Sequence, residues 1–156
     1  MPTTIAAYAG RSIDLVAFQG AQESGEVLLV AALALDGGSG SIVTGIQKLA
    51  QRFLLELLTE KGSITYSTRG TNFMSDARLG AWRTSGDVEQ SFYSALVDIR
   101  RNLILEESLT DPKDERFSSA SILSVFLRDD GVSIRVQVTS LAGTKRVFIA
   151  PLPLVV

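Results

Sequence analysis

The sequence of 156 residues contains neither cysteine nor histidine. Without cysteine there can be no disulfide, no thiolate nucleophile, no iron–sulfur cluster and no cysteine zinc site. Without histidine there is no Ser-His-Asp triad, and the commonest general base and metal ligand is missing. These two absences narrow the enzyme chemistry that the chain can perform, and they leave its redox compartment open.

An excess of basic charge and a long hydrophobic run are also missing. The chain has 15 basic and 17 acidic residues, a net charge of −2, so it lacks the basic footprint of a nucleic-acid-binding protein. The longest apolar run, residues 27–35, is far shorter than the ~18 residues that span a bilayer. The start, Met1 to Thr4, has no signal-peptide architecture. We therefore expect a soluble protein that binds neither nucleic acid nor membrane.

The length fits one domain with an appendage, and 46% apolar residues suffice for a core. Residues 12–18 and 26–35 read as strands joined by a polar turn at 19–25. The second run is apolar on both faces, as in a central strand or a buried helix turn, and its length and flanking glycines favour a strand. We predict a β appendage and Gly-rich linker in residues 1–40, and an α+β core with an extended tail in 41–156.

Two amphipathic helices are predicted in the core. Thr44-x-x-Gln47 has the form of a capping box, and Gly62 is placed to end the first helix in a left-handed cap. A second helix starts near Asp87, with Asp87-x-x-Gln90 as its cap, and runs to about residue 107. The apolar stripe of the first helix, at helical spacing, consists of Ile46, Leu49, Ala50, Phe53, Leu54, Leu57 and Leu58. Its solvent side is predicted to carry Lys48, Gln51, Arg52 and Glu56.

In residues 63–86 the apolar side chains recur at neither helical nor strand spacing, so we predict a loop. We expect this loop to be ordered, because Tyr66, Phe73 and Trp82 should pack against the core. Strands follow at 122–128, 132–139 and 145–150, and the middle one alternates apolar and polar residues. The predicted fold class is α+β: two amphipathic helices packed on a C-terminal antiparallel three-stranded meander, with an N-terminal β-hairpin appendage.

Carboxylates are the candidates for acid–base chemistry. Asp129 and Asp130 precede a glycine in a hairpin turn, where aspartate is favoured for turn geometry alone. Asp111, Asp114 and Glu115 cluster beside an arginine that is more typical of an ion-pair anchor. No calcium-loop pattern occurs, and the glycines at 37–40 lack the Gly-Lys-Ser/Thr of a phosphate loop. We predict no catalytic residue, no cofactor and no metal.

The order of elements in residues 44–150 resembles the baseplate wedge or sheath-initiator family of contractile phage tails and injection systems, a family that carries the label lysozyme-like. The residues that carry the resemblance are the helix beginning Gly45-Ile46-Gln47-Lys48-Leu49-Ala50-Gln51-Arg52, the turn Gly70-Thr71-x-Phe73, and the triplet Asp114-Glu115-Arg116 before the meander. The family has Glu-Pro-Arg at that triplet, so the arginine matches and the proline does not.

The resemblance implies a structural, non-enzymatic virion protein of the tail baseplate, seated around the tube in a six-fold ring. Its implied partners are the tail sheath protein, baseplate wedge proteins and the tail tube or hub. It would initiate sheath assembly by strand donation or acceptance. The alternatives are an unrelated α+β protein-binding adaptor and a glycan hydrolase that uses paired acids.

The predicted structural and interface residues fall in three groups. The first lies at the turn and the triplet, where the arginine is expected to hold carboxylates or strand carbonyls. The second is the last strand, expected at a sheet edge open to strand addition. The third is the uncharged tail, in which prolines should prevent further pairing and a neighbouring subunit, or else the domain itself, should cover the aliphatics. These residues are Gly70, Thr71, Glu115, Arg116, Lys145, Arg146, Val147, Phe148, Ile149, Leu152 and Leu154.

Overall fold

The computed structural model describes residues 42–129 and 131–153, together with Arg11 and the short stretches 14–15, 22–23 and 26–28. The helices are α1 (Gly45–Leu58), α2 (Phe73–Arg78) and α3 (Ser85–Glu106). The strands are β1 (Asp14–Leu15), β2 (Gln22–Glu23), β3 (Glu26–Leu28), β4 (Ile42–Val43), β5 (Phe117–Arg128), β6 (Gly131–Ser140) and β7 (Lys145–Pro153).

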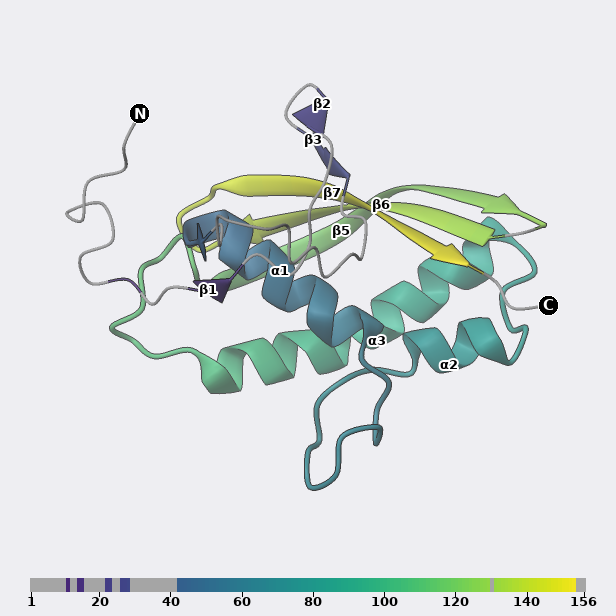
Figure 1. Cartoon of the computed structure of the whole chain (residues 1–156), viewed down its shortest axis with the longest axis horizontal. Coiled ribbons are helices and arrows are strands. Elements are labelled where there is room, and N and C mark those ends of the chain that lie inside the picture. Colours follow the sequence, from purple (N-terminus) through teal and green to yellow (C-terminus); the bar gives the residue numbers. More distant parts are fainter. Residues whose placement is uncertain are drawn as a thin grey trace, which may run out of the picture.

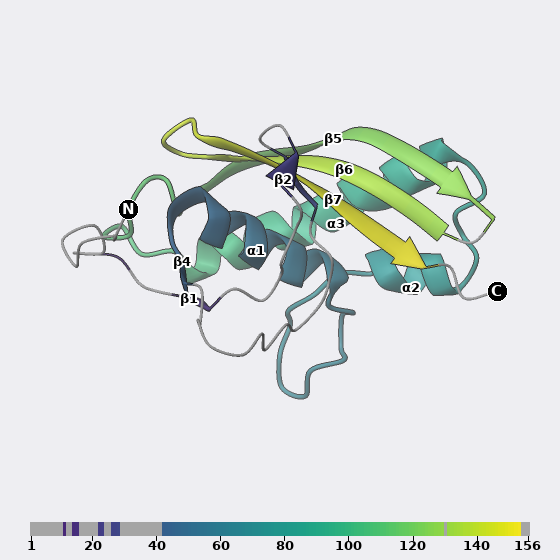
Figure 2. The same ribbon diagram turned by 45° about the horizontal axis from the view of Figure 1, so that its top comes forward.

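The molecule has two layers, a twisted sheet and a layer of helices that covers one of its faces (Figure 1). The sheet has the order β2-β3-β7-β6-β5, in which β6 is antiparallel to both neighbours and β3 runs parallel to β7. The turned view shows α1 and α3 under the same face of the sheet (Figure 2). The predicted α+β class, with helices packed on a C-terminal meander, is confirmed.

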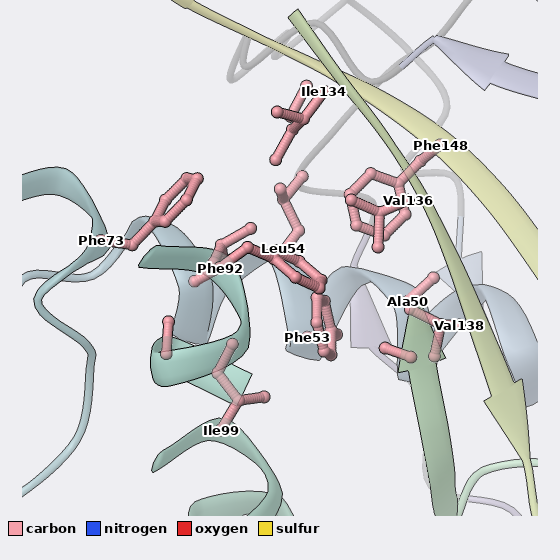
Figure 3. Close-up of a cluster of buried hydrophobic side chains, with 14 of the residues drawn as sticks. Ala50, Phe53, Leu54, Phe73, Phe92, Ile99, Ile134, Val136, Val138 and Phe148 are labelled. Carbon is pink, nitrogen blue, oxygen red and sulfur yellow. The ribbon is translucent and has the colours of Figure 1, made fainter. Parts of the chain in front are cut away.

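The core lies between the two layers and is centred on Phe53 of α1 (Figure 3). The ring of Phe53 lies 6.2, 5.9 and 6.1 Å from those of Phe92, Phe117 and Phe148, which come from α3, β5 and β7. Burying one such side chain contributes about 1.5–3 kcal/mol, so this aromatic cluster holds both layers together. The predicted alternation of β6 is confirmed, since its inward side chains are fully buried. They are Val132, Ile134, Val136 and Val138.

Helix α1 forms where its apolar stripe predicts it, but its termini differ from the prediction. Thr44 is the N-cap residue and makes no side-chain capping bond, so the predicted capping box is wrong. The first backbone N–H of the helix, that of Gly45, donates to Glu115 Oε1 at 3.0 Å. The helix ends at Leu58, and Gly62, with φ of +84°, lies in the following loop rather than in the cap.

The predicted loop at 63–86 contains the short helix α2, which sequence reasoning missed. Phe73 and Trp82 are buried and in contact, with ring centroids 4.6 Å apart, as predicted. Tyr66 is fully exposed on the segment between α1 and α2, which projects away from the sheet, so its predicted role in pinning the loop is wrong (Figures 1 and 2). Helix α3 begins at Ser85, two residues before the predicted start, so the predicted cap Asp87-x-x-Gln90 is wrong: Thr84 is the N-cap residue and Asp87 its partner.

The N-terminal strands pair differently from the prediction. A hairpin is present, but it joins Gln22–Glu23 to Glu26–Leu28, inside and just after the predicted turn. Asp14–Leu15, from the first predicted strand, pairs with Ile42–Val43 instead. The reason is that β3 finds a partner in the meander, with Val27 and Leu28 opposite Phe148 and Ile149 of β7. The rest of the predicted strand at 26–35 and most of the predicted linker lie outside the described residues.

Candidate functional site

Charged side chains gather around an open cavity of about 460 Å³ beside α1. Its walls come from the polar side of α1, the end of α3 and the segments that precede α2 and β5. Three cations and four carboxylates line it, so its charge is nearly balanced. The lining residues are Lys48, Arg52, Leu55, Glu56, Arg69, Leu103, Glu106, Asp111 and Glu115, and we refer to them as the charged pocket.

Glu115 occupies one end of the charged pocket and is 3% exposed. Its Oε1 accepts from Gly45 N at 3.0 Å and from Arg11 Nη1 at 3.2 Å, and its Oε2 accepts from Lys48 Nζ at 3.2 Å. Arg11 also donates to Asp114 Oδ2 at 2.8 Å, and this bond raises the pKa of the guanidinium. One carboxylate therefore joins the start of α1, its second turn and the N-terminal segment.

Glu56 occupies the other end and is 6% exposed, although its position had been predicted to face solvent. Its Oε2 accepts from Gly70 N at 3.1 Å and from Asn102 Nδ2 at 3.0 Å, and Arg69 Nε lies 3.6 Å from its Oε1. Gln51, predicted on the same solvent side, is likewise buried. Glu56 thus ties the loop after α1 to α3.

Glu106 and Asp111 complete the acidic lining. Glu106 forms ion pairs with Arg69 and with Arg52, the latter at 3.1 Å, and Asp111 Oδ2 accepts from Ser108 N at 2.8 Å. Each carboxylate of the charged pocket therefore accepts from a described donor, which suits it to hold segments in place. In the described part of the chain, no three side chains of metal-ligating type gather in one group.

The turn Gly70-Thr71-x-Phe73 is a buried structural joint. Gly70 has φ of +88°, and Thr71 is completely buried. The Thr71 hydroxyl donates to Leu57 O at 3.1 Å and accepts from Phe73 N at 3.2 Å. The two residues predicted from the family resemblance therefore connect the end of α1 to the start of α2.

Arg116 has a smaller part than the triplet suggested. Its Nε lies 3.8 Å from Glu107 Oε2, and within the described residues this Nε has no hydrogen-bond acceptor. Glu107 Oε1 also accepts from Phe117 N at 2.5 Å, at the first residue of β5. The residue of the triplet on which most contacts converge is Glu115.

The predicted edge strand pairs with β6 along its length and has a second neighbour, β3, only near its middle. Lys145, Arg146 and Val147 pair with β6, and Phe148 and Ile149 lie between β6 and β3. The prediction of an open edge is therefore wrong at Phe148 and Ile149, because their parallel partner comes from far away in the sequence. At Lys145 to Val147 the described residues show a partner on the β6 side alone.

The tail contradicts the prediction that its prolines prevent further pairing, whereas Leu152 follows the second predicted alternative, burial by the domain itself. The strand continues through Pro153, and Leu152 is 5% exposed opposite Val132, so the domain itself covers this side chain. Leu154 lies outside the described residues. Within the part of the chain that the structure describes, the two outer strands of the sheet are the two-residue β2 and the long β5.

β5 has the features of a usable sheet edge. It is twelve residues long and has two register shifts against β6, after Phe117 and after Ile122. Leu123 and Phe126 are 46% and 60% exposed on it. Sequence reasoning missed this edge because the order of strands in the sheet cannot be read from the period of each strand.

No protein-family model, curated protein or solved structure matches this chain. Among the described helices, none combines the length and the apolarity that a membrane crossing needs.

Proposed function

We propose that the chain is a structural, non-enzymatic component of a contractile tail baseplate that initiates sheath assembly by accepting a strand from the sheath protein. The observation that carries the proposal is the edge at β5, beyond which no strand lies among the described residues. The unpaired backbone groups of such an edge bind an added strand through main-chain hydrogen bonds.

The arrangement of the elements supports the family resemblance on which the proposal depends. α1 runs into the buried joint at Gly70 and Thr71, the long α3 follows, and the meander begins directly after Asp114-Glu115-Arg116. This is the order that the resemblance implies. The sheath-initiator role and the six-fold baseplate setting are taken from that resemblance.

β5 offers both affinity and register to an incoming strand. At about 3.3 Å per residue, twelve residues span roughly 40 Å, which is long enough to pair with a whole strand. The exposed side chains of Leu123 and Phe126 give an incoming strand apolar contacts at defined positions.

Binding of the purified chain to purified sheath protein tests the proposal. The double variant Leu123→Lys/Phe126→Lys places two charges on the edge and should abolish the binding, because charged edges resist strand addition. Leu79→Lys is the matched control, since Leu79 is 80% exposed at the end of α2 and away from the sheet. A double variant that binds sheath protein like the parent chain would refute strand acceptance at β5.

Two further measurements separate the alternatives. If the chain copurifies with other proteins but with neither sheath nor wedge proteins, it is an adaptor of another kind. Incubation with peptidoglycan between about pH 4 and 8 should leave the polymer intact, because Glu115 is engaged by Arg11, Gly45 and Lys48. Lysis above the buffer control that disappears in Glu115→Gln would establish the hydrolase instead.

A further inference from the structure

α3 carries an apolar stripe on the side opposite the core. Its buried side includes Phe92 and Ile99, whereas Tyr93, Val97 and Ile104 are 46%, 71% and 48% exposed. At 3.6 residues per turn, positions 93, 97, 100 and 104 follow one line along the helix. These alternating steps of four and three residues are the spacing of a seam between two packed helices.

Two charged residues border this stripe without an ion pair in the part of the chain described. Arg100 lies on the line between Val97 and Ile104, and Glu89 lies one turn before Tyr93; both are exposed. The neighbouring Asp98, in contrast, pairs with Arg101 at 3.0 Å and with Lys61 at 3.3 Å. Among the described residues, the stripe therefore has an anion without an ion pair towards its start and a cation without an ion pair towards its end.

We propose that the stripe binds the same stripe of a second copy of this chain, with the two α3 helices antiparallel about a two-fold axis. A two-fold interface requires that when residue i contacts residue j, j also contacts i. Placing Glu89 opposite Arg100 satisfies both charges of both copies at once. It also fixes the register of the whole contact.

The register that the charges define also brings apolar groups together. With Glu89 opposite Arg100, Tyr93 of each copy lies against Val97 of the other. Ile104 falls on Gly86 in the first turn of the opposite helix, where an exposed glycine leaves space for a branched side chain. An aromatic residue near the centre of a contact is typical of binding hot spots.

The charge pattern favours a second copy of the chain over another binding partner. In an antiparallel copy of the same stripe, the anion of each helix lies opposite the cation of the other. One helix from each copy buries less than the ~1,600 Å² of a standard interface, so the dimer is weak and depends on concentration. The inference does not depend on the proposed role in sheath assembly.

Sedimentation velocity of the full chain over about 1–200 μM tests the proposal, since weak interfaces dissociate in the micromolar range. The parent chain should shift from monomer to dimer across this range. Val97→Asp should raise the dissociation constant at least tenfold, whereas Leu109→Lys, which changes an 88% exposed side chain beyond the end of α3, should leave it unchanged. A parent chain that is monomeric at every concentration overturns the proposal.

A charge exchange tests the register itself. Glu89→Arg alone and Arg100→Glu alone should each be monomeric, because each places like charges opposite one another twice. An equimolar mixture of the two variants should form a heterodimer, in which an arginine pair faces a glutamate pair, and the double variant on one chain should dimerise again. If either single variant dimerises like the parent chain, or the mixture stays monomeric, the antiparallel register is refuted.

Discussion

Glu115 accepts from donors in three segments, Arg11, Gly45 and Lys48, and it is almost completely buried. Removing this buried acceptor leaves the N–H of Gly45 and the partly buried cations of Arg11 and Lys48 without it. Glu115→Ala should therefore lower the free energy of unfolding by about 3 kcal/mol. Glu115→Gln should cost less, because an amide oxygen can still accept from Gly45 N. Guanidinium unfolding followed by the fluorescence of the single tryptophan, Trp82, measures both.

Asp129→Ala is the matched control, because Asp129 is an exposed turn residue, and its change should stay within about 0.5 kcal/mol. Glu115→Ala that unfolds at the same denaturant concentration as the parent chain would show that the contacts of Glu115 do not stabilise the fold.

Gly70 has a left-handed backbone conformation and lies close to the backbone of Thr59. At φ of +88°, an added Cβ would lie 2.5 Å from Thr59 O. Gly62 has a similar φ of +84° but nothing within 4 Å of the same position. We expect Gly70→Ala to cost about 3 kcal/mol and Gly62→Ala about 1 kcal/mol, because only the first adds a clash to the conformational cost. Urea unfolding of both variants measures the difference, and equal losses would contradict the clash.

These residues differ in how far the sequence could predict them. Gly70 and Thr71 stand in a short turn whose pattern is local, and the structure places both in a buried joint. The role of Glu115 depends on donors 104, 70 and 67 positions away. No local pattern contains such distances, so the carboxylate could be noted as a candidate but its partners could not be named.

At the scale of elements, the two long helices were predicted because their apolar residues recur at helical spacing over several turns. α2 was missed because six residues with a single buried side chain, Phe73, cannot display a period. The capping box predicted at Thr44 is wrong, because the Thr44 side chain makes no capping bond. The N–H of Gly45, which a capping box does not use, donates to the distant Glu115. A capping box does occur at the start of α3, where Thr84 is the N-cap residue and Asp87 is its partner.

The contrast between the two caps gives a matched pair of variants. Thr84→Ala removes a side chain that accepts from Asp87 N, and it should lower the free energy of unfolding by about 1 kcal/mol. Thr44→Ala removes no capping bond and should cost clearly less. Thermal unfolding followed by circular dichroism compares the two, and a larger loss for Thr44→Ala would contradict the assignment of the caps.

The same box predicts a dependence on pH. The backbone N–H of Thr84, 2.7 Å from Asp87 Oδ2, is the main cause of a lowered pKa of this carboxyl group, and the Thr84 hydroxyl and Arg83 N–H add to it. Because the pKa is lower in the folded state, the stabilisation is present above the unfolded pKa and is lost as pH falls through the folded pKa.

The advantage of the parent chain over Asp87→Asn should therefore be largest near neutral pH and should shrink as the pH falls towards about 3. Melting temperatures of both chains across this range check the trend. A difference that grows on acidification would mean that Asp87 does not titrate as the capping geometry requires.

At the scale of the whole molecule, the α+β class could be predicted because two segments with helical spacing of apolar residues precede three segments with strand spacing. The pairing partners of the strands could not be predicted from this spacing. β3 joins β7 in parallel from more than a hundred residues away, and this pairing covers the predicted edge strand at Phe148 and Ile149. Prolines at 151 and 153 were expected to end the ladder, yet they lie in register with Ser133 and Gly131. A proline is compatible with a strand where its missing N–H faces away from the partner.

Leu152 decides whether the tail belongs to the domain or to an interface. It is 5% exposed and lies opposite Val132, which is 2% exposed, on the face of the sheet that the helices cover. Leu152→Ala should lower the free energy of unfolding by about 3 kcal/mol, through lost burial and the cavity it leaves. Phe126→Ala is the matched control: this side chain is 60% exposed in β5, so its loss should cost clearly less. Deleting residues 151–156 should destabilise the isolated chain at least as much as Leu152→Ala. An unchanged unfolding midpoint for Leu152→Ala, together with lost binding to sheath protein, would instead place this side chain at an interface with a partner.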